Sequence, residues 1–350
     1  MVGLSFNDLG GWPAVLSRLL AGEDLSGAEA GCALGEVLSG MASPAQIAAF
    51  VTALRAKGET VDEMAGFVRE MLAHAEKVSV DGDLLDTCGT GGDRSRSINV
   101  STMAALVAVG AGARVCKHGG RAATSAAGSA DVLESLGVVI DLGPEQVAEC
   151  IEETGIGFCF APRFHPAMKF AAPVRSELGV PTIFNFLGPL ANPARVRFQV
   201  VGVSNPAMAE KMLGVLAANG STRAMVVHGA DGLDELTTTG VTDVLELDAD
   251  RIRSYKIDAL DLGLPRATVE DLRGGDPSFN AEVVRSVLAG SDGPHRDVVL
   301  LNAAAALVVA GMADDMEDGV AKGAAAIDEG RANATLDSLV RVSQRIRAEA

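Results

Sequence analysis

A glycine-rich segment in the first third of the chain has the composition of a phosphate-binding loop. In the run Asp86-Thr-Cys-Gly-Thr-Gly-Gly-Asp93, the glycines leave backbone N–H groups open to an anion. Taken alone, a glycine triplet is equally consistent with an ordinary turn between a strand and a helix. The neighbouring segments decide between these two interpretations.

A second segment suited to an anion follows at residues 97–102. Ser97, Asn99, Ser101 and Thr102 lie at the start of a helix expected over 103–110. The free N–H groups and the dipole of a helix N-terminus favour negative charge. Simple N-capping by Asn99 or Ser101 is the alternative, and it is compatible with ligand binding.

Residues 117–125, Lys-His-Gly-Gly-Arg-Ala-Ala-Thr-Ser, combine two cations, an imidazole and hydroxyl groups around a glycine pair. In isolation, Lys117 and Arg121 would more often be a solvated surface pair, and His118 a structural histidine. The segment follows an expected strand, at the edge where open α/β sheets bind ligands, so we interpret it as a loop that covers phosphate. Ser129, at the start of the next expected helix, adds a weaker anion site.

Three carboxylates follow a later expected strand within five residues: Asp231, Asp234 and Glu235. Such a density forms either a solvated acidic turn or a site for a divalent cation. Magnesium prefers a few carboxylates together with water and substrate phosphate oxygens. Beside several phosphate-suited segments, Asp234 and Glu235 are predicted to bind Mg²⁺.

The elements that position these segments change type near residue 84. Residues 12–77 have apolar residues at helical spacing, with Ser43 as an N-cap and Pro44 in the first turn. Beyond them, short apolar runs alternate with helices, as in an α/β sheet. Strands are expected at 84–87, 114–117, 157–160, 196–203, 224–228 and 244–247, and helices at 101–110, 130–136, 145–154 and 207–218.

The predicted fold class is α/β, with a small all-helical N-terminal domain and a large α/β domain whose mostly parallel central sheet is flanked by helices. A length of 350 residues exceeds one compact core and favours such a division. Because a helical pattern returns at 163–178, the small domain is predicted to be discontinuous. It comprises 1–80, rejoined by about 163–195, and the large domain comprises 81–162 and 196–350.

Composition excludes several classes of partner. A formal net charge of −17 argues against nonspecific nucleic-acid binding, which depends on Lys and Arg. Five cysteines without a CxxC pair indicate reduced thiols and a cytoplasmic protein. The N-terminus lacks the basic region of a secretory signal. The longest apolar run, 298–313, contains Asn302 and is too short to span a membrane, so we expect a buried helix and no membrane partner.

In their order along the chain, six segments resemble the signature of anthranilate phosphoribosyltransferases: DTCGTGGD, NVST, KHGGRAATSAAGSADVLESLG, FAPRFHPAMKFAAPVRSELG, TIFNFLGPLANP and HGADGLDELTTTG. The resemblance implies a fold of the nucleoside phosphorylase and phosphoribosyltransferase class and a homodimer formed through the helical part. It also implies Mg²⁺-dependent transfer of the phosphoribosyl group of 5-phosphoribosyl 1-diphosphate (PRPP) to the amine of anthranilate. Pyrophosphate is released, and the step belongs to tryptophan biosynthesis.

The resemblance also implies individual roles. Arg175 is expected to meet the anthranilate carboxylate, although without the family it would be interpreted as a surface arginine. His118 is expected to orient the acceptor or remove its proton. Ser101, Asp234 and Glu235 match the metal positions. The expected substrate-binding residues are Gly89, Thr90, Gly92, Asp93, Ser97, Asn99, Val100, Ser101, Thr102, Lys117, His118, Gly119, Gly120, Arg121, Ala122, Ala123, Thr124, Ser125, Ser129 and Arg175.

One position departs from the family pattern. The family usually carries an asparagine that helps to hold anthranilate where this chain has Gly120. Either water or a neighbouring residue replaces the missing amide, with weaker acceptor binding, or the acceptor differs; we favour the first explanation because Arg175 and the phosphate segments are in place. The alternative functions are a pyrimidine nucleoside phosphorylase and a noncatalytic nucleic-acid-binding relative of the same fold.

Overall fold

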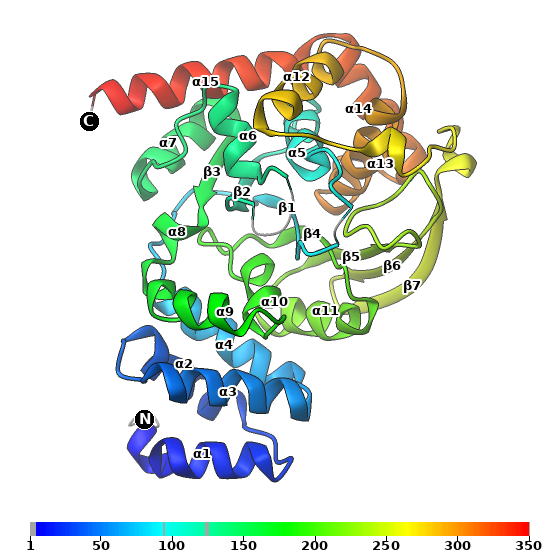
Figure 1. The fold of residues 1–350 in the computed structure, drawn as a ribbon. Helices are drawn as coiled ribbons and strands as arrows, with labels where there is room; N and C mark the ends of the chain where they lie inside the picture. The colour runs from blue at the N-terminus through cyan, green and yellow to red at the C-terminus, as the bar shows by residue number, and fades with distance from the viewer. Residues whose placement is uncertain (1–4, 94, 123–125, 350) are drawn as a thin grey trace.

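The computed structural model describes residues 5–93, 95–122 and 126–349. A helical part lies at one end of the molecule and a larger α/β part at the other (Figure 1). The helical part contains α1 (Gly11–Leu20), α2 (Gly27–Leu38), α3 (Pro44–Lys57) and α4 (Val61–Ala73), preceded by a short 3-10 helix, η1 (Phe6–Leu9). The predicted all-helical opening is confirmed.

Local sequence explains where these helices begin. Ser26, Ser43 and Thr60 each accept a hydrogen bond from the backbone N–H three residues later, and the residue at that position bonds back to the cap. These capping boxes satisfy N–H groups that the helix itself leaves free. The N-cap predicted at Ser43, with Pro44 in the first turn, is confirmed.

The α/β part is built on a seven-stranded sheet of order β3-β2-β1-β4-β5-β6-β7. Its strands are β1 (Leu85–Gly89), β2 (Val115–Gly119), β3 (Ile156–Phe160), β4 (Phe198–Gly202), β5 (Arg223–Gly229), β6 (Val241–Asp248) and β7 (Arg251–Asp258). The first five in this order pair in parallel, and β6 and β7 are antiparallel. The sheet is therefore mixed but mostly parallel, and the carboxyl ends of β1 and β2 meet at one edge.

Helices cover both faces of the sheet. One face carries α5 (Val100–Gly110), α6 (Ser129–Ser135), α7 (Pro144–Thr154), α12 (Pro277–Leu288), α13 (Pro294–Val309), α14 (Met316–Asp328) and α15 (Arg331–Glu349). The other face carries α10 (Phe184–Leu190) and α11 (Ala209–Ala218), which lie between the sheet and the helical part. Short 3-10 helices complete the chain: η3 (Pro206–Met208), η4 (Ala259–Leu262) and η5 (Glu270–Leu272).

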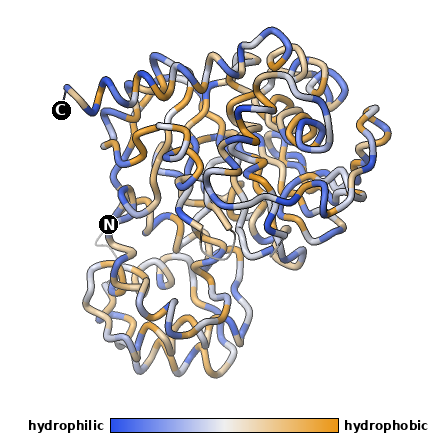
Figure 2. The backbone as a smooth tube through the Cα atoms, turned by 45° about the horizontal axis from the view of Figure 1, so that its top comes forward, coloured by the Kyte–Doolittle hydropathy of each residue, from blue (hydrophilic) through white to orange (hydrophobic). Residues whose placement is uncertain are grey.

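The sheet separates two apolar cores. Successive residues of β4 point to opposite faces, so Val200 packs with α5 and α13 while Val201 packs with α10, α11 and the opening helices. Figure 2 shows that apolar residues concentrate inside the α/β part and along the inner sides of the helices. The apolar run at 298–313 forms most of the buried helix α13, as expected.

Two sequence-based assignments need correction. The helix expected over 163–178 is three short pieces, α8 (Ala161–Phe164), η2 (Pro166–Phe170) and α9 (Ala172–Leu178). Pro166 and Pro173 each lack an N–H and restrict the residue before them, so one continuous helix cannot form. Strand β7 was not expected because its eight residues include four charged ones and are mostly exposed.

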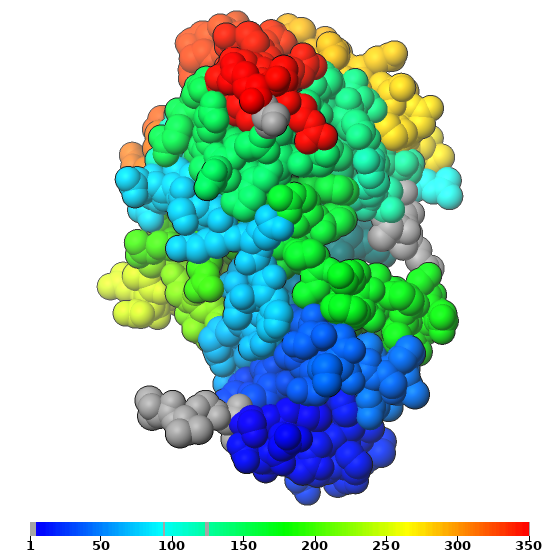
Figure 3. Space-filling model, turned by 90° about the vertical axis from the view of Figure 1, so that its left-hand side faces the viewer, coloured from blue at the N-terminus to red at the C-terminus, as the bar shows by residue number. Residues whose placement is uncertain are grey.

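The segment between β3 and β4 returns to the helical part. Its buried residues Val174 and Phe184 belong to the same apolar core as α1–α4, and α9 contacts α3. Figure 3 shows this segment, in green, lying against the blue opening helices. The packing is compatible with the expected discontinuous division into 1–80 with about 163–195, and 81–162 with 196–350. The division itself stays a prediction.

We expect Gly202→Ala to lower the free energy of unfolding by roughly 3 kcal/mol, because forced overpacking carries a penalty of that order. A Cβ at Gly202 would lie 1.6 Å from the carbonyl oxygen of Asp234, which is backbone and cannot move aside alone. Urea denaturation measures the change. Gly240→Ala is the matched control, since its nearest neighbour would be 3.5 Å away; an unchanged midpoint in the Gly202 variant would contradict the packing.

Candidate active site

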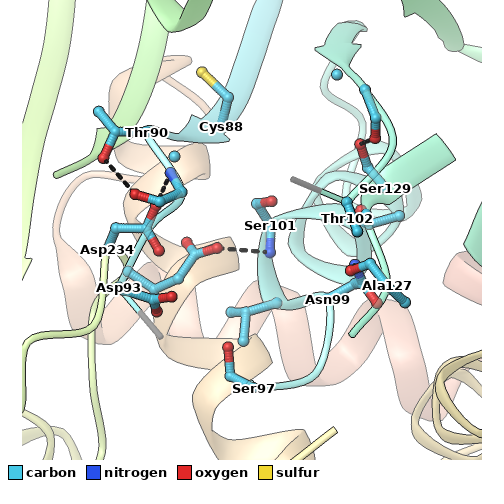
Figure 4. Close-up of a pocket in the computed structure, with 18 of the residues that line it drawn as sticks. Cys88, Thr90, Asp93, Ser97, Asn99, Ser101, Thr102, Ala127, Ser129 and Asp234 are labelled. Carbon is cyan, nitrogen blue, oxygen red and sulfur yellow. Dashed lines mark hydrogen bonds between the residues drawn. The ribbon is translucent and has the colours of Figure 1, made fainter. Parts of the chain in front are cut away.

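A cavity of about 340 Å³ opens at the carboxyl ends of β1 and β2, beside the N-termini of α5 and α6 (Figure 4). Most of the expected residues line it: Gly89, Thr90, Gly92, Asp93, Ser97, Asn99, Val100, Ser101, Thr102, Lys117, His118, Gly119, Gly120, Arg121, Ala122, Ser129, Asp234 and Glu235. Ala123, Thr124 and Ser125 lie outside the described residues. Arg175 is not among the lining residues.

The loop after β1 has the backbone that an anion site needs. Gly91 and Gly92 have φ angles of +67° and +81°, which L-residues with a Cβ rarely adopt. The Gly91 N–H donates to Asp234 Oδ2 at 2.6 Å. Ser204, which was not predicted from the sequence, donates its hydroxyl to the Gly91 carbonyl at 2.9 Å and thereby supports the loop from the end of β4.

Lys117 is a buried cation at the wall of the cavity. Its ammonium donates to the Thr87 carbonyl and, at 3.2 Å, to the Ser101 hydroxyl, while its side chain forms no ion pair with any described carboxylate. The surface-pair interpretation is therefore wrong for Lys117. Arg121 differs, since it is exposed and pairs with Asp131 and Glu134 of α6, each at 2.8 Å.

The N-terminus of α5 faces the cavity and has no side-chain cap from its own N-cap residue, although the Glu235 carboxylate accepts the Ser101 N–H at 3.3 Å. Asn99 holds the N-cap position, but its amide donates to the Ala127 carbonyl at 3.1 Å and its oxygen accepts from Asn280 at 2.8 Å. The capping alternative is thus wrong for Asn99. The buried Thr102 hydroxyl has no hydrogen-bond partner among the described residues. The Thr102 hydroxyl at this helix end is therefore available to hydrogen-bond a ligand.

Three carboxylates, Asp93, Asp234 and Glu235, lie close enough to repel one another, and Figure 4 shows the first two side by side. Burial, reinforced by Asp93, raises the pKa of Asp234 to about 7. Burial and the charge of Asp234 raise the pKa of Glu235 to about 8, against the opposing effect of Lys117. A bound cation would relieve this unfavourable crowding of negative charge.

The fit to magnesium follows from this set of oxygens. Among the residues that the structure describes, no group of three metal-ligating side chains forms a closed site. Magnesium does not require one, because it keeps several waters and completes its octahedron with phosphate oxygens. Asp234 and Glu235 beside an open, phosphate-suited cavity fit such an ion.

His118 is a neutral hydrogen-bond acceptor. Its Nδ1 lies 3.2 Å from the Gly188 carbonyl, which can only accept, so Nδ1 carries the proton and Nε2 keeps a free lone pair. Nε2 is buried and has no partner among the described residues. Burial, together with His165 at a ring distance of 5.1 Å, lowers the pKa of His118 to about 3.

Two buried residues, neither of them expected as a site residue, hold His118 in place. Asp86 accepts the His118 backbone N–H at 3.2 Å and the Asn192 side-chain amide at 2.8 Å. The same Asn192 amide also donates to the Cys116 carbonyl at 2.8 Å. Burial raises the pKa of Asp86, partly offset by Lys117. The segment before β4 is thereby tied to both strands that end at the cavity.

Arg175 carries a guanidinium that is unpaired among the described residues. The group stacks 5.6 Å from the ring centroid of Phe184, and it has no hydrogen bond or ion pair with a described residue. Burial lowers its pKa. Asn185, the residue after Phe184, lines the cavity.

The fold and the site together define a class of enzyme with a helical bundle and an α/β domain. Models of the glycosyl transferase family match both parts: the helical bundle domain matches residues 13–75 and the a/b domain matches residues 81–333. The anthranilate phosphoribosyltransferase of Salinispora arenicola is 52% identical over 345 residues, which are 96% of this chain and 98% of that protein. The chain belongs to the anthranilate phosphoribosyltransferase family.

Solved structures agree with this assignment. The anthranilate phosphoribosyltransferase of Thermus thermophilus superposes with a TM-score of 0.90 at 42% identity, covering 94% of this chain and 99% of that one. The Saccharomyces cerevisiae enzyme in complex with PRPP and Mg gives 0.88 at 28% identity, with 95% and 98% covered. The predicted family and fold class are confirmed.

We expect the imidazole of His118 to stay neutral between pH 8 and pH 5, because its pKa is lowered from 6.5 to about 3. The measurement is histidine NMR, with His118→Gln identifying the signal and the remaining histidines serving as internal references. Chemical shifts that titrate with a midpoint near the unperturbed value would contradict the buried, singly protonated state.

Proposed function

We propose that this chain transfers the phosphoribosyl group of PRPP to the amine of anthranilate, the reaction of its family in tryptophan biosynthesis. The observation that carries the proposal is one cavity that combines a glycine loop, a buried lysine, an open helix N-terminus and two crowded carboxylates. In the reaction, the bond between C1 and the pyrophosphate oxygen breaks and a C1–N bond forms with inversion. The amine loses one proton.

The donor binds through its phosphate groups. The backbone N–H groups of Gly92 and Asp93 and the start of α5 hold the pyrophosphate, and the Lys117 ammonium neutralises part of its charge. Ser129, at the N-terminus of α6, also lines the cavity. These groups are fixed before the donor arrives, so they stabilise the leaving group without reorganisation.

Asp234, Glu235 and Ser101 hold Mg²⁺ beside the pyrophosphate. When bound, the ion supplies charge stabilisation to the departing pyrophosphate oxygens. The carboxylates are held in place by their neighbours, since Asp234 bonds to the Gly91 N–H and Glu235 to the Ser101 N–H at 3.3 Å. Because their pKa values are raised, Asp234 and Glu235 are partly protonated at neutral pH, and binding of a cation would release these protons.

The acceptor needs positioning more than activation, because an aromatic amine is already neutral at pH 7. The free Nε2 lone pair of His118 accepts an amine N–H and takes up the proton as the new bond forms. Arg175, a guanidinium without a partner, meets the carboxylate. The acceptor is thus held between a neutral base and a cation.

The remaining expectations belong to the same proposal. We infer a cytoplasmic homodimer that uses no nucleic-acid or membrane partner; no helix of the described residues could cross a bilayer. A pyrimidine nucleoside phosphorylase would consume thymidine or uridine with phosphate, and a nucleic-acid-binding relative would shift single-stranded DNA in a gel.

The deciding assay follows the fluorescence of anthranilate, which should fall only when protein, PRPP and Mg²⁺ are all present. The double substitution Asp234→Asn and Glu235→Gln should reduce this turnover at least ~100-fold, since metal stabilisation of leaving-group charge is worth several kcal/mol. Asp243→Asn is the matched control, an exposed carboxylate on β6 that pairs only with Lys256. Wild-type turnover in the double variant would exclude the metal assignment.

Gly120→Asn should lower the KM for anthranilate about fivefold, the equivalent of one hydrogen bond of ~1 kcal/mol. The substitution is sterically permitted, because a Cβ at Gly120 would meet no atom closer than 4.0 Å and the backbone is not left-handed. The KM for PRPP serves as the internal control and should not change. An unchanged KM for anthranilate would mean that another group already supplies the amide.

A further inference from the structure

Asn185 lines the cavity but comes from a part of the chain that contributes no other lining residue. The cavity wall is otherwise formed by residues 88–129 and by the pair Asp234 and Glu235. Asn185 is the only one among the described residues that belongs to the segment between β3 and β4, at the start of α10. This segment also carries Arg175.

The orientation of the Asn185 amide is fixed by the backbone that leads into α10. Its side-chain oxygen accepts the backbone N–H of Thr182 at 3.0 Å. A backbone N–H can only donate, so the atom that faces it must be Oδ1. The opposite Nδ2 group therefore points away from the backbone, and within the described chain it has no hydrogen-bond partner. The side chain offers two N–H donors and no free negative charge.

The other side-chain amide that lines the cavity, that of Asn99, has no free N–H donor group to offer a ligand. Asn99 uses Nδ2 for the Ala127 carbonyl and Oδ1 for Asn280. Gly120 has no side chain. Asn185, by contrast, directly follows Phe184, whose ring lies under the unpaired guanidinium of Arg175. Two groups with free N–H donors thus come from one segment, and one of them contacts the residue that precedes the other.

We propose that Asn185 is a substrate-contacting residue whose Nδ2 donates a hydrogen bond to the acceptor carboxylate, which Arg175 binds from the same segment. The inference rests on the proposed function and deepens it, because it names a second recognition group for the acceptor. A carboxylate has two oxygens and about four lone-pair positions, so it accepts donors from a guanidinium and an amide together. Asn185 therefore selects acceptors that carry a negatively charged group.

The test is Asn185→Asp, which preserves size and leaves a carboxylate oxygen to accept the Thr182 N–H. The variant removes both N–H donors and places a negative charge toward the acceptor. We expect the KM for anthranilate to rise at least ~10-fold, because hydrogen bonds to charged groups are stronger than neutral ones. The KM for PRPP and the unfolding midpoint should stay at wild-type values. Competition by anthranilamide, which is neutral and carries amide donors, should become stronger relative to anthranilate.

Asn205→Asp is the matched control, since the side-chain oxygen of Asn205 likewise accepts a nearby backbone N–H, that of Ala207 at 3.1 Å, and Asn205 does not line the cavity. It should leave both KM values unchanged. A wild-type KM for anthranilate in the Asn185 variant would overturn the inference while leaving the transferase activity standing. A wild-type protein that consumes no anthranilate would overturn the proposed function and the inference with it.

Discussion

The close approach of the turn around Asp234 to the ends of β1 and β4 is the constraint on which the site depends. A Cβ at Gly202 would overlap the Asp234 carbonyl oxygen, and a Cβ at Gly89 would lie 2.3 Å from its carboxylate. The turn around Asp234 can pack against both strand ends only because each has glycine, which lacks a Cβ. In this position, Asp234 accepts a hydrogen bond from the Gly91 N–H, and Glu235 faces the start of α5. The cation site and the phosphate loop are thus one packing unit.

The same close approach has an electrostatic consequence. Gathering Asp93, Asp234 and Glu235 at one wall raises the pKa values of two of them toward neutrality. The charge of the buried Lys117 offsets only part of this repulsion. A site of this kind gains most from a cation that arrives together with phosphate, since the cation satisfies the carboxylates while phosphate satisfies the lysine and the helix end. The cavity is organised for a pair of ligands of opposite charge.

Much of this organisation could be predicted from the sequence, because glycine loops and polar helix starts directly follow apolar strands. Six of the seven strands and the two phosphate-suited loops were expected at nearly their observed positions. The single helix expected over 163–178 is wrong because Pro166 and Pro173 divide the segment into separate short helices. No role was expected for Asp86, Asn185, Asn192 or Ser204. The first three lie inside segments that the sequence singles out, but all four gain their roles from contacts across more than 30 residues or from a place in the cavity wall.

The buried carboxylate of Asp86 has a consequence for genetics. It joins the backbone of His118 to the side chain of Asn192, so it holds together two stretches of chain that are far apart in the sequence. Replacing Asp86 would leave the buried N–H groups of His118 and Asn192 without an acceptor and would shift the His118 imidazole. A screen for tryptophan auxotrophs would then score Asp86 as indispensable, like a residue of the chemical step. Its part would nevertheless be architectural, and suppressors would be expected in the chain around Asn192 more than at the substrate.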